Sequence, residues 1–182
     1  DAIRAAITDS FNLPEYKQLN NNFSVCIFDG GLGSETVIKQ WVKEYIPQGV
    51  QSSHPSLLAH GGEVCSTCLF GPFNSESNTF QPPYTDVDIV RVLSADDLDP
   101  DLFDVLTRIE NVLKEKKYKY VNLSLGPRLP VDDDDVHVWT SVIDSLLQDG
   151  HCLATVAIGN DGDLAGEDGR IQPPSDMVNC FA

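Results

Sequence analysis

Short apolar segments alternate with helical patterns along this chain, and no other feature constrains its fold as strongly. Four segments are rich in β-branched and aromatic residues and are bounded by Gly, Asp, Asn or Pro, as β-strands are. They span residues 23–28, 87–93, 118–125 and 152–158. The stretches 102–113 and 138–147 place apolar residues three and four positions apart, which is typical of amphipathic helices. The alternation predicts an α/β fold with three αβα layers and a mainly parallel sheet.

The sequence also indicates where these helices begin and end. Asp99 and Pro100 precede the first helical stretch as a capping carboxylate and a first-turn proline. After the second stretch, Gly150 can supply the left-handed residue that stops a helix. The run 132–135, four aspartates just before that stretch, is expected to stabilise the positive N-terminal end of the helix. The last residues, VNCFA, resemble the start of another strand.

Size and charge argue against several classes of partner. The chain has 182 residues, enough for one domain with a sizeable core. Its net charge is -16, whereas nucleic acids and anionic membrane surfaces require clustered Lys and Arg, so we expect neither as a partner. No apolar stretch approaches the length of a membrane span, and residues 1–18 lack the apolar core of a signal peptide.

The five cysteines indicate a reducing environment. Their number is odd, and most lie in apolar segments where Cys behaves as a small buried hydrophobic residue. We therefore expect free thiols and a cytoplasmic location. Cys65 and Cys68 form a C-x-x-C pair, but no second Cys or His pair follows at a zinc-ligand spacing, so no metal site is predicted there.

The stretch FSVCIFDGGLG places Asp29 at the end of an apolar run, directly before glycines. Ligands and catalytic groups gather at the carboxyl ends of strands in open α/β sheets, so Asp29 could hold a phosphate or metal, or orient a catalytic histidine. Asp and Gly are also the residues that a sharp strand exit prefers. The stretch alone leaves these alternatives open.

Three further segments carry polar residues at comparable positions. His60 precedes two glycines and a helical pattern, which predicts an exposed histidine at a helix start, although a polar residue near a helix cap has the same signature. The predicted strand 118–125 finishes with Ser124 and Leu125, followed by Gly126. The predicted strand 152–158 delivers Asn160 at its carboxyl end.

In this order, the segments resemble the motifs of the subtilisin-like serine proteases, the subtilases. The first motif of that family is an aspartate that closes a strand and precedes a small residue and Gly, and IFDGG matches it at Asp29. The second is His-Gly-Thr with a Val three places after the Gly. HGGEV matches it at His60, with Gly62 in place of the usual Thr.

The resemblance continues toward the C-terminus. The substrate-binding strand of the family carries Ser-Leu-Gly, matched by Ser124, Leu125 and Gly126, and its oxyanion-hole segment Ala-x-Gly-Asn is matched by AIGN at Asn160. VRVL at 90–93 also resembles the strand before the family's long helix. The match covers about residues 23–182, with residues 1–22 as a lead-in segment.

The resemblance implies a role for each matched residue. Asp29 would accept a hydrogen bond from His60, which would act as general base and then as general acid. Asn160 would donate to the developing oxyanion. Ser124, Leu125 and Gly126 would bind an extended peptide or protein substrate by strand addition. The resemblance thus implies a serine endopeptidase.

The sequence departs from the family at the nucleophile. Subtilases carry it in a Gly-Thr-Ser motif, which occurs nowhere in these 182 residues, and Ser124 belongs to the substrate strand instead. We expect this chain to be the N-terminal part of a catalytic domain, inactive alone and partnered by the missing C-terminal part. The alternative is a catalytically inactive peptide-binding or regulatory module with the same fold. A third possibility is a nucleotide-binding domain with DGGLGSE as its phosphate loop, but no Lys-Ser or Lys-Thr follows that loop.

No cofactor is predicted with certainty. Calcium is a common ligand of subtilases, so the resemblance makes two oxygen-rich segments candidate sites, the loop 74–78 and the acidic run 132–135.

Overall fold

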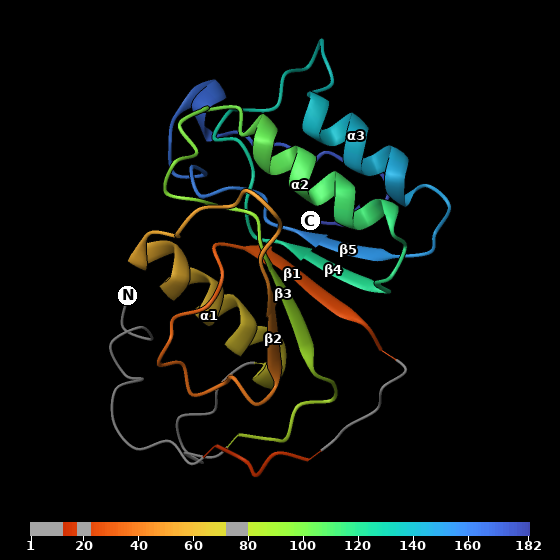
Figure 1. The fold of residues 1–182 in the computed structure, drawn as a ribbon. Helices are drawn as coiled ribbons and strands as arrows, with labels where there is room; N and C mark the ends of the chain where they lie inside the picture. The colour runs from red at the N-terminus through yellow and green to blue at the C-terminus, as the bar shows by residue number, and fades with distance from the viewer. Residues whose placement is uncertain (1–12, 18–22, 72–79) are drawn as a thin grey trace.

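A computed structural model describes residues 13–17, 23–71 and 80–182. In this part of the chain, six parallel strands form one sheet in the order β2-β3-β1-β4-β5-β6. Figure 1 labels the first five strands of this order. The strands are β1 (Val25–Asp29), β2 (Val42–Tyr45), β3 (Val87–Arg91), β4 (Tyr120–Leu123), β5 (Leu153–Val156) and β6 (Cys180–Phe181). The helices are α1 (Pro55–Phe70), α2 (Phe103–Lys114), α3 (Val138–Leu147) and the short 3-10 helix η2 (Gly166–Gly169).

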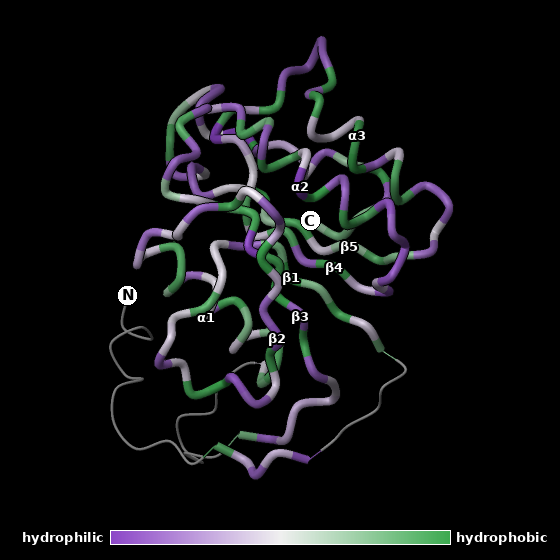
Figure 2. The backbone as a smooth tube through the Cα atoms, viewed as in Figure 1, coloured by the Kyte–Doolittle hydropathy of each residue, from purple (hydrophilic) through white to green (hydrophobic). Residues whose placement is uncertain are grey.

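Helices cover both faces of the sheet, which gives the three predicted layers. Helix α1 lies on one face and helices α2 and α3 lie on the other (Figure 1). Successive side chains of a strand point to opposite faces, so Ile27 packs toward α1 whereas Cys26 and Phe28 pack toward α2 and α3. Figure 2 shows hydrophobic residues along the central strands. The observed α/β architecture confirms the predicted fold class.

The four predicted strands and both predicted helices are present, with bounds shifted by a few residues. Strand β6 confirms the strand-like character of VNCFA. Strand β2 was not predicted, because its sequence VKEY is short and half charged and therefore gives no apolar run. Its position at the edge of the sheet explains why it tolerates this composition.

The predicted helix ends are partly wrong. Gly150 has a φ of 69° and donates its N–H to the Leu147 carbonyl, as expected of a helix stop. Pro100, however, lies outside α2, whose N-cap is Leu102. Asp99 still accepts a hydrogen bond from the Phe103 N–H at 3.1 Å, so its carboxylate satisfies the helix end from three residues before the cap.

Among the described residues, no hydrogen bond or ion pair joins the four aspartates at 132–135 to the start of α3. The helix has no acidic residue in its first turn, and the imidazole of His137 caps it by accepting the Trp139 N–H at 3.3 Å. Asp133 instead forms an ion pair with Arg170 at 2.8 Å. The hydrogen-bonding cap of this helix is therefore His137 rather than an aspartate of the run, and an electrostatic effect of the run on the helix end stays a prediction.

Candidate active site

The matched residues lie at the end of the sheet where the strands terminate. In a parallel sheet, the carboxyl ends of all strands lie on the same side. Asp29 is the last residue of β1, Ser124 follows β4, and Asn160 lies beyond β5. β1, β4 and β5 are neighbours in that order. Crevices at the carboxyl ends of such strands are where α/β proteins bind ligands. The topology thus collects three of the four matched segments along this edge.

Asp29 contributes a buried carboxylate at this edge. Its side chain has no exposed surface, and Oδ1 accepts the Gly30 N–H at 2.7 Å. Both carboxylate oxygens also face Nδ1 of His60, at 3.0 and 2.9 Å. A buried carboxylate needs such partners, because burial without hydrogen bonds disfavours the charge. Asp29 therefore does more than turn the chain after β1.

His60 reaches Asp29 from helix α1. The helix begins at Pro55, so the expectation of a histidine at the helix start is wrong, and His54 occupies the N-cap instead. The His60 side chain is 43% exposed, although its partner is buried. With Nδ1 facing Asp29, the other ring nitrogen, Nε2, lies on the opposite side of the imidazole. This arrangement suits a proton acceptor whose tautomer a carboxylate fixes.

Glycines allow α1 to approach the turn after Asp29. A Cβ at Gly61 would clash with the Gly31 carbonyl, and a Cβ at Gly30 would clash with Leu57 of α1. Helix and turn therefore touch backbone to backbone beside His60. Gly62 has open space around it, so the absence of the threonine usual in subtilases leaves the contact between Asp29 and His60 in place.

The segment 124–126 has an unpaired backbone. Within the described ranges, no backbone–backbone hydrogen bond involves Ser124, Leu125 or Gly126. The Ser124 hydroxyl accepts a hydrogen bond from the Asn122 side chain at 2.9 Å, and Gly126 packs directly against the Pro173 carbonyl. An extended peptide could pair with this free backbone by strand addition.

Asn160 is exposed beyond β5, next to a charged network. Asp161 accepts hydrogen bonds from Arg128 at 2.8 and 2.6 Å and from Gln172 at 2.7 Å. The Arg128 guanidinium holds the pKa of the Asp161 carboxyl below its usual value, against the opposing effect of desolvation. The network ties the segment after β4 to the segment after β5. Sequence reasoning missed it, because its members lie far apart in the chain and match no motif.

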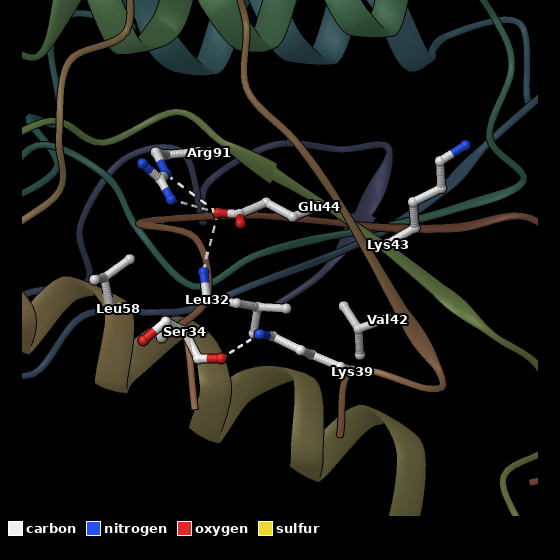
Figure 3. Close-up of a pocket in the computed structure, with 9 residues that line it drawn as sticks. Leu32, Ser34, Lys39, Val42, Lys43, Glu44, Leu58 and Arg91 are labelled. Atoms are coloured by element: carbon white, nitrogen blue, oxygen red, sulfur yellow. Dashed lines mark hydrogen bonds and ion pairs between the residues drawn. The ribbon is translucent and has the colours of Figure 1, made fainter. Parts of the chain in front are cut away.

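A second polar cluster lies on the α1 side of the same edge. A cavity of about 630 Å³ opens there between the turn after β1, strand β2 and Leu58 of α1. In Figure 3, the Glu44 carboxylate and the Arg91 guanidinium point toward each other beside the Leu32 backbone, and Lys43 points away from them. The sequence patterns did not indicate Glu44 as a site residue, because they did not predict strand β2.

The described residues contain no group of three His, Cys, Asp or Glu side chains placed to hold a metal ion. The candidate calcium loop 74–78 lies outside them. All five cysteines are free thiols. Cys65 is buried in α1 and Cys68 is exposed one turn later, as neighbours three residues apart on a helix can be. Burial raises the pKa of the Cys65 thiol far above its usual value.

Two other interpretations of the sequence can be checked against the described residues. The stretch DGGLGSE leads through turns into β2 rather than into a helix, so it lacks the helix N-terminus that a phosphate loop uses. None of the described helices has the length and apolar character that a membrane span requires.

Comparison with known proteins finds similarity in structure but not in sequence. No protein-family model matches the chain, and no curated protein matches it significantly. Among solved structures, the patellamide maturation protease PatA has a TM-score of 0.58 at 21% identity, covering 90% of this chain and 56% of its own. The prenylagaramide maturation protease PagA has a TM-score of 0.57 at 18% identity, covering 87% and 52%.

A third similar structure is a Pseudomonas sedolisin, a serine-carboxyl proteinase, with a TM-score of 0.58 at 15% identity, covering 87% of this chain and 47% of its own. The chain thus spans about half the length of these structures. At such identities the likeness concerns the fold alone, and that fold is one that serine proteases use.

Proposed function

We propose that this chain is part of a serine endopeptidase of subtilisin type, in which it supplies the aspartate that orients the histidine, the histidine that acts as general base, and the oxyanion donor. The observation that carries the proposal is the pair of buried Asp29 and half-exposed His60, joined through Nδ1 at 2.9 Å. A carboxylate that accepts Nδ1–H keeps Nε2 basic and stabilises the imidazolium that forms when Nε2 takes a proton.

In the proposed reaction, His60 Nε2 removes the hydroxyl proton of a serine as its Oγ attacks the peptide carbonyl carbon. The resulting oxyanion receives a hydrogen bond from the Asn160 side-chain amide, whose exposure at the carboxyl edge leaves it able to turn toward a substrate. Collapse of the tetrahedral intermediate expels the amine, which takes the proton from His60. Water then hydrolyses the acyl-enzyme by the same steps.

The serine is proposed to come from a segment outside these 182 residues. The chain contains no Gly-Thr-Ser motif, and Ser124 accepts a hydrogen bond from Asn122 within the segment after β4. The similar protease structures extend well beyond the part that this chain matches, which leaves room for a nucleophile there. On this proposal, the 182-residue chain alone hydrolyses no peptide.

The proposed substrate is an extended peptide or protein segment. Its backbone would pair with residues 124–126, which make no backbone–backbone hydrogen bond outside the strands among the described residues. Main-chain pairing of this kind gives affinity with little sequence preference, whereas flanking pockets give specificity.

The test uses the natural full-length protein and a library of quenched fluorogenic peptides. We expect peptide hydrolysis that His60→Ala and Asp29→Asn each reduce by roughly 10⁴-fold or more, because either change removes the oriented base. His151→Ala serves as the control. This histidine precedes β5 at the opposite, amino edge of the sheet, so its removal should leave hydrolysis unchanged.

Hydrolysis that survives His60→Ala would contradict the proposal. A full-length protein that binds peptides but cleaves none would instead identify a peptide-binding module with an inactive protease fold.

A further inference from the structure

The Glu44 and Arg91 side chains form a partly buried ion pair directly behind the turn that follows Asp29 (Figure 3). Side chains alternate along a strand, so Asp29, Glu44 and Arg91 all point to the α1 face, as do the core residues two positions before each of them. Three adjacent strands, β2, β3 and β1, therefore bring these charges to the same face and the same end of the sheet.

One oxygen of Glu44 gathers three hydrogen bonds. Oε1 accepts from Arg91 Nε at 3.1 Å, from Arg91 Nη2 at 2.7 Å and from the Leu32 backbone N–H at 3.1 Å. The Glu44 side chain is 23% exposed and the Arg91 side chain is 14% exposed, so the pair is shielded from solvent far better than a surface ion pair. Charge-assisted bonds from the guanidinium fork also fix direction as well as distance.

The pair lies against the turn that follows Asp29, the aspartate proposed to orient His60. Gly31 has a φ of +97°, and a Cβ there would clash with the Glu44 carboxylate and lie 2.6 Å from Arg91 Nε. Arg91 is the register partner of Asp29 in the β1–β3 pair, and the next residue, Val92, donates its N–H to the Asp29 carbonyl at 2.8 Å. The ion pair thus holds Asp29 from β3 and the residues after it from β2.

The same turn also contacts helix α1. The Gly31 carbonyl touches the backbone at Gly61, the residue that follows His60. A shift of Gly31 therefore moves the helix at the position where His60 projects toward Asp29. Glu44 is thus connected to His60 indirectly: it contacts the turn at Gly31, and that turn contacts Gly61 beside His60.

We propose that Glu44, with Arg91, is a positioning residue that sets the hydrogen bond between His60 and Asp29. This inference rests on the proposed function for its catalytic consequence, but the hydrogen bond itself can be measured without turnover. Loss of the Glu44 carboxylate leaves the Leu32 N–H and the Arg91 guanidinium without their acceptor. The turn at Gly31 then relaxes, and His60 Nδ1 moves away from Asp29.

The experiment measures the tautomer of His60 by ¹⁵N NMR in the full-length protein with labelled histidine. In the wild type, neutral His60 should carry its proton on Nδ1, because Asp29 accepts it. Glu44→Ala should raise the Nε2–H population severalfold while the denaturation midpoint shows a folded protein. In the peptide assay, kcat should fall by roughly 10- to 100-fold with KM within twofold, since a misplacement near 1 Å costs about that much.

Two more variants separate positioning from simple stability. Glu44→Gln keeps an oxygen acceptor for the Leu32 N–H and should restore most of the Nδ1–H population. Glu110→Ala removes a carboxylate from the ion pair with Lys114 on α2, on the opposite face of the sheet, and should change neither readout. If Glu44→Ala fails to fold, Arg91→Lys decides: it keeps the charge and most of the side-chain volume but loses the guanidinium fork, so it should raise the Nε2–H population, and a folded Arg91→Lys protein with the wild-type tautomer would overturn the inference.

A folded Glu44→Ala protein with the wild-type tautomer and wild-type kcat would overturn the inference. A changed tautomer in a protein that never cleaves peptides would keep the positioning role and reject the proposed protease function.

Discussion

The two faces of the sheet differ in how their helices pack. On the face of α2 and α3, 18 buried residues form one continuous core of interlocking side chains. On the α1 face, nine buried residues form the core within residues 13–17, 23–71 and 80–182, and the helix meets the turn after β1 through backbone contacts at glycines. The polar pairs of Asp29 with His60 and Glu44 with Arg91 also lie on this second face.

The larger apolar core and the two polar pairs therefore lie on opposite faces of the sheet. Tight side-chain packing supplies most of the free energy that holds a sheet together. Glycine contacts bury less apolar surface, but they allow backbone and polar side chains to approach one another closely. We therefore expect mutations on the α2 and α3 face to change stability alone, and mutations on the α1 face to change the Asp29–His60 contact as well.

The largest stability effect should come from the α2 and α3 face. Ile109 of α2 is fully buried in the larger core, and Ile109→Ala should lower the free energy of unfolding by about 2–5 kcal/mol, through lost apolar burial and the cavity left behind. Urea denaturation measures this cost. The histidine NMR spectrum should still show the wild-type His60 tautomer, and a changed tautomer would break the division between the faces.

A neighbouring pair of glycines on α1 tests the other face. Gly61→Ala places a methyl group against the Gly31 carbonyl and should cost about 1–3 kcal/mol, because a packed backbone cannot move aside cheaply. Gly62→Ala meets no atom within 4 Å and should instead stabilise the helix by up to about 1 kcal/mol. Denaturation midpoints give both signs.

Only Gly61→Ala should also disturb the hydrogen bond between His60 and Asp29 in the NMR spectrum. Equal effects of the two substitutions on stability would show that the backbone contact at Gly61 has no special role.

The sequence predicts the α2 and α3 face much better than the α1 face. The apolar stripes of the two helices are regular, and both helices were located from them. On the α1 face, two glycines after His60 resemble a helix start, but they lie inside α1, where Gly61 serves close packing. The charged strand β2 has no apolar pattern, so neither it nor Glu44 could be found from periodicity.

Motifs succeed where periodicity fails. The order of short motifs singled out Asp29 and His60, and the structure joins them by a hydrogen bond. The Arg128–Asp161–Gln172 network and the Glu44–Arg91 pair depend on long-range approach of polar side chains, which local sequence does not encode.

A smaller, pH-dependent effect should come from the charged network next to Asn160. Arg128 lowers the pKa of Asp161 in the folded protein, so this carboxylate stabilises the fold at pH values above its ordinary pKa near 4. That contribution is lost as the pH falls through the lowered pKa. Arg128→Ala should therefore reduce stability at pH 7, and its difference from the wild type should vanish in acid. Denaturation midpoints between pH 7 and pH 2 follow this difference, and a constant difference would exclude Asp161 as its source.

The most direct test of the proposed acid–base pair is labelling of the full-length protein with a fluorophosphonate probe, which requires an activated serine. We expect one labelled serine, outside the 182 residues described by this sequence, and labelling that His60→Ala abolishes and His151→Ala leaves unchanged. A folded full-length protein that contains such a serine but labels no faster than its His60→Ala variant would contradict the account, because His60 would then not act as a general base.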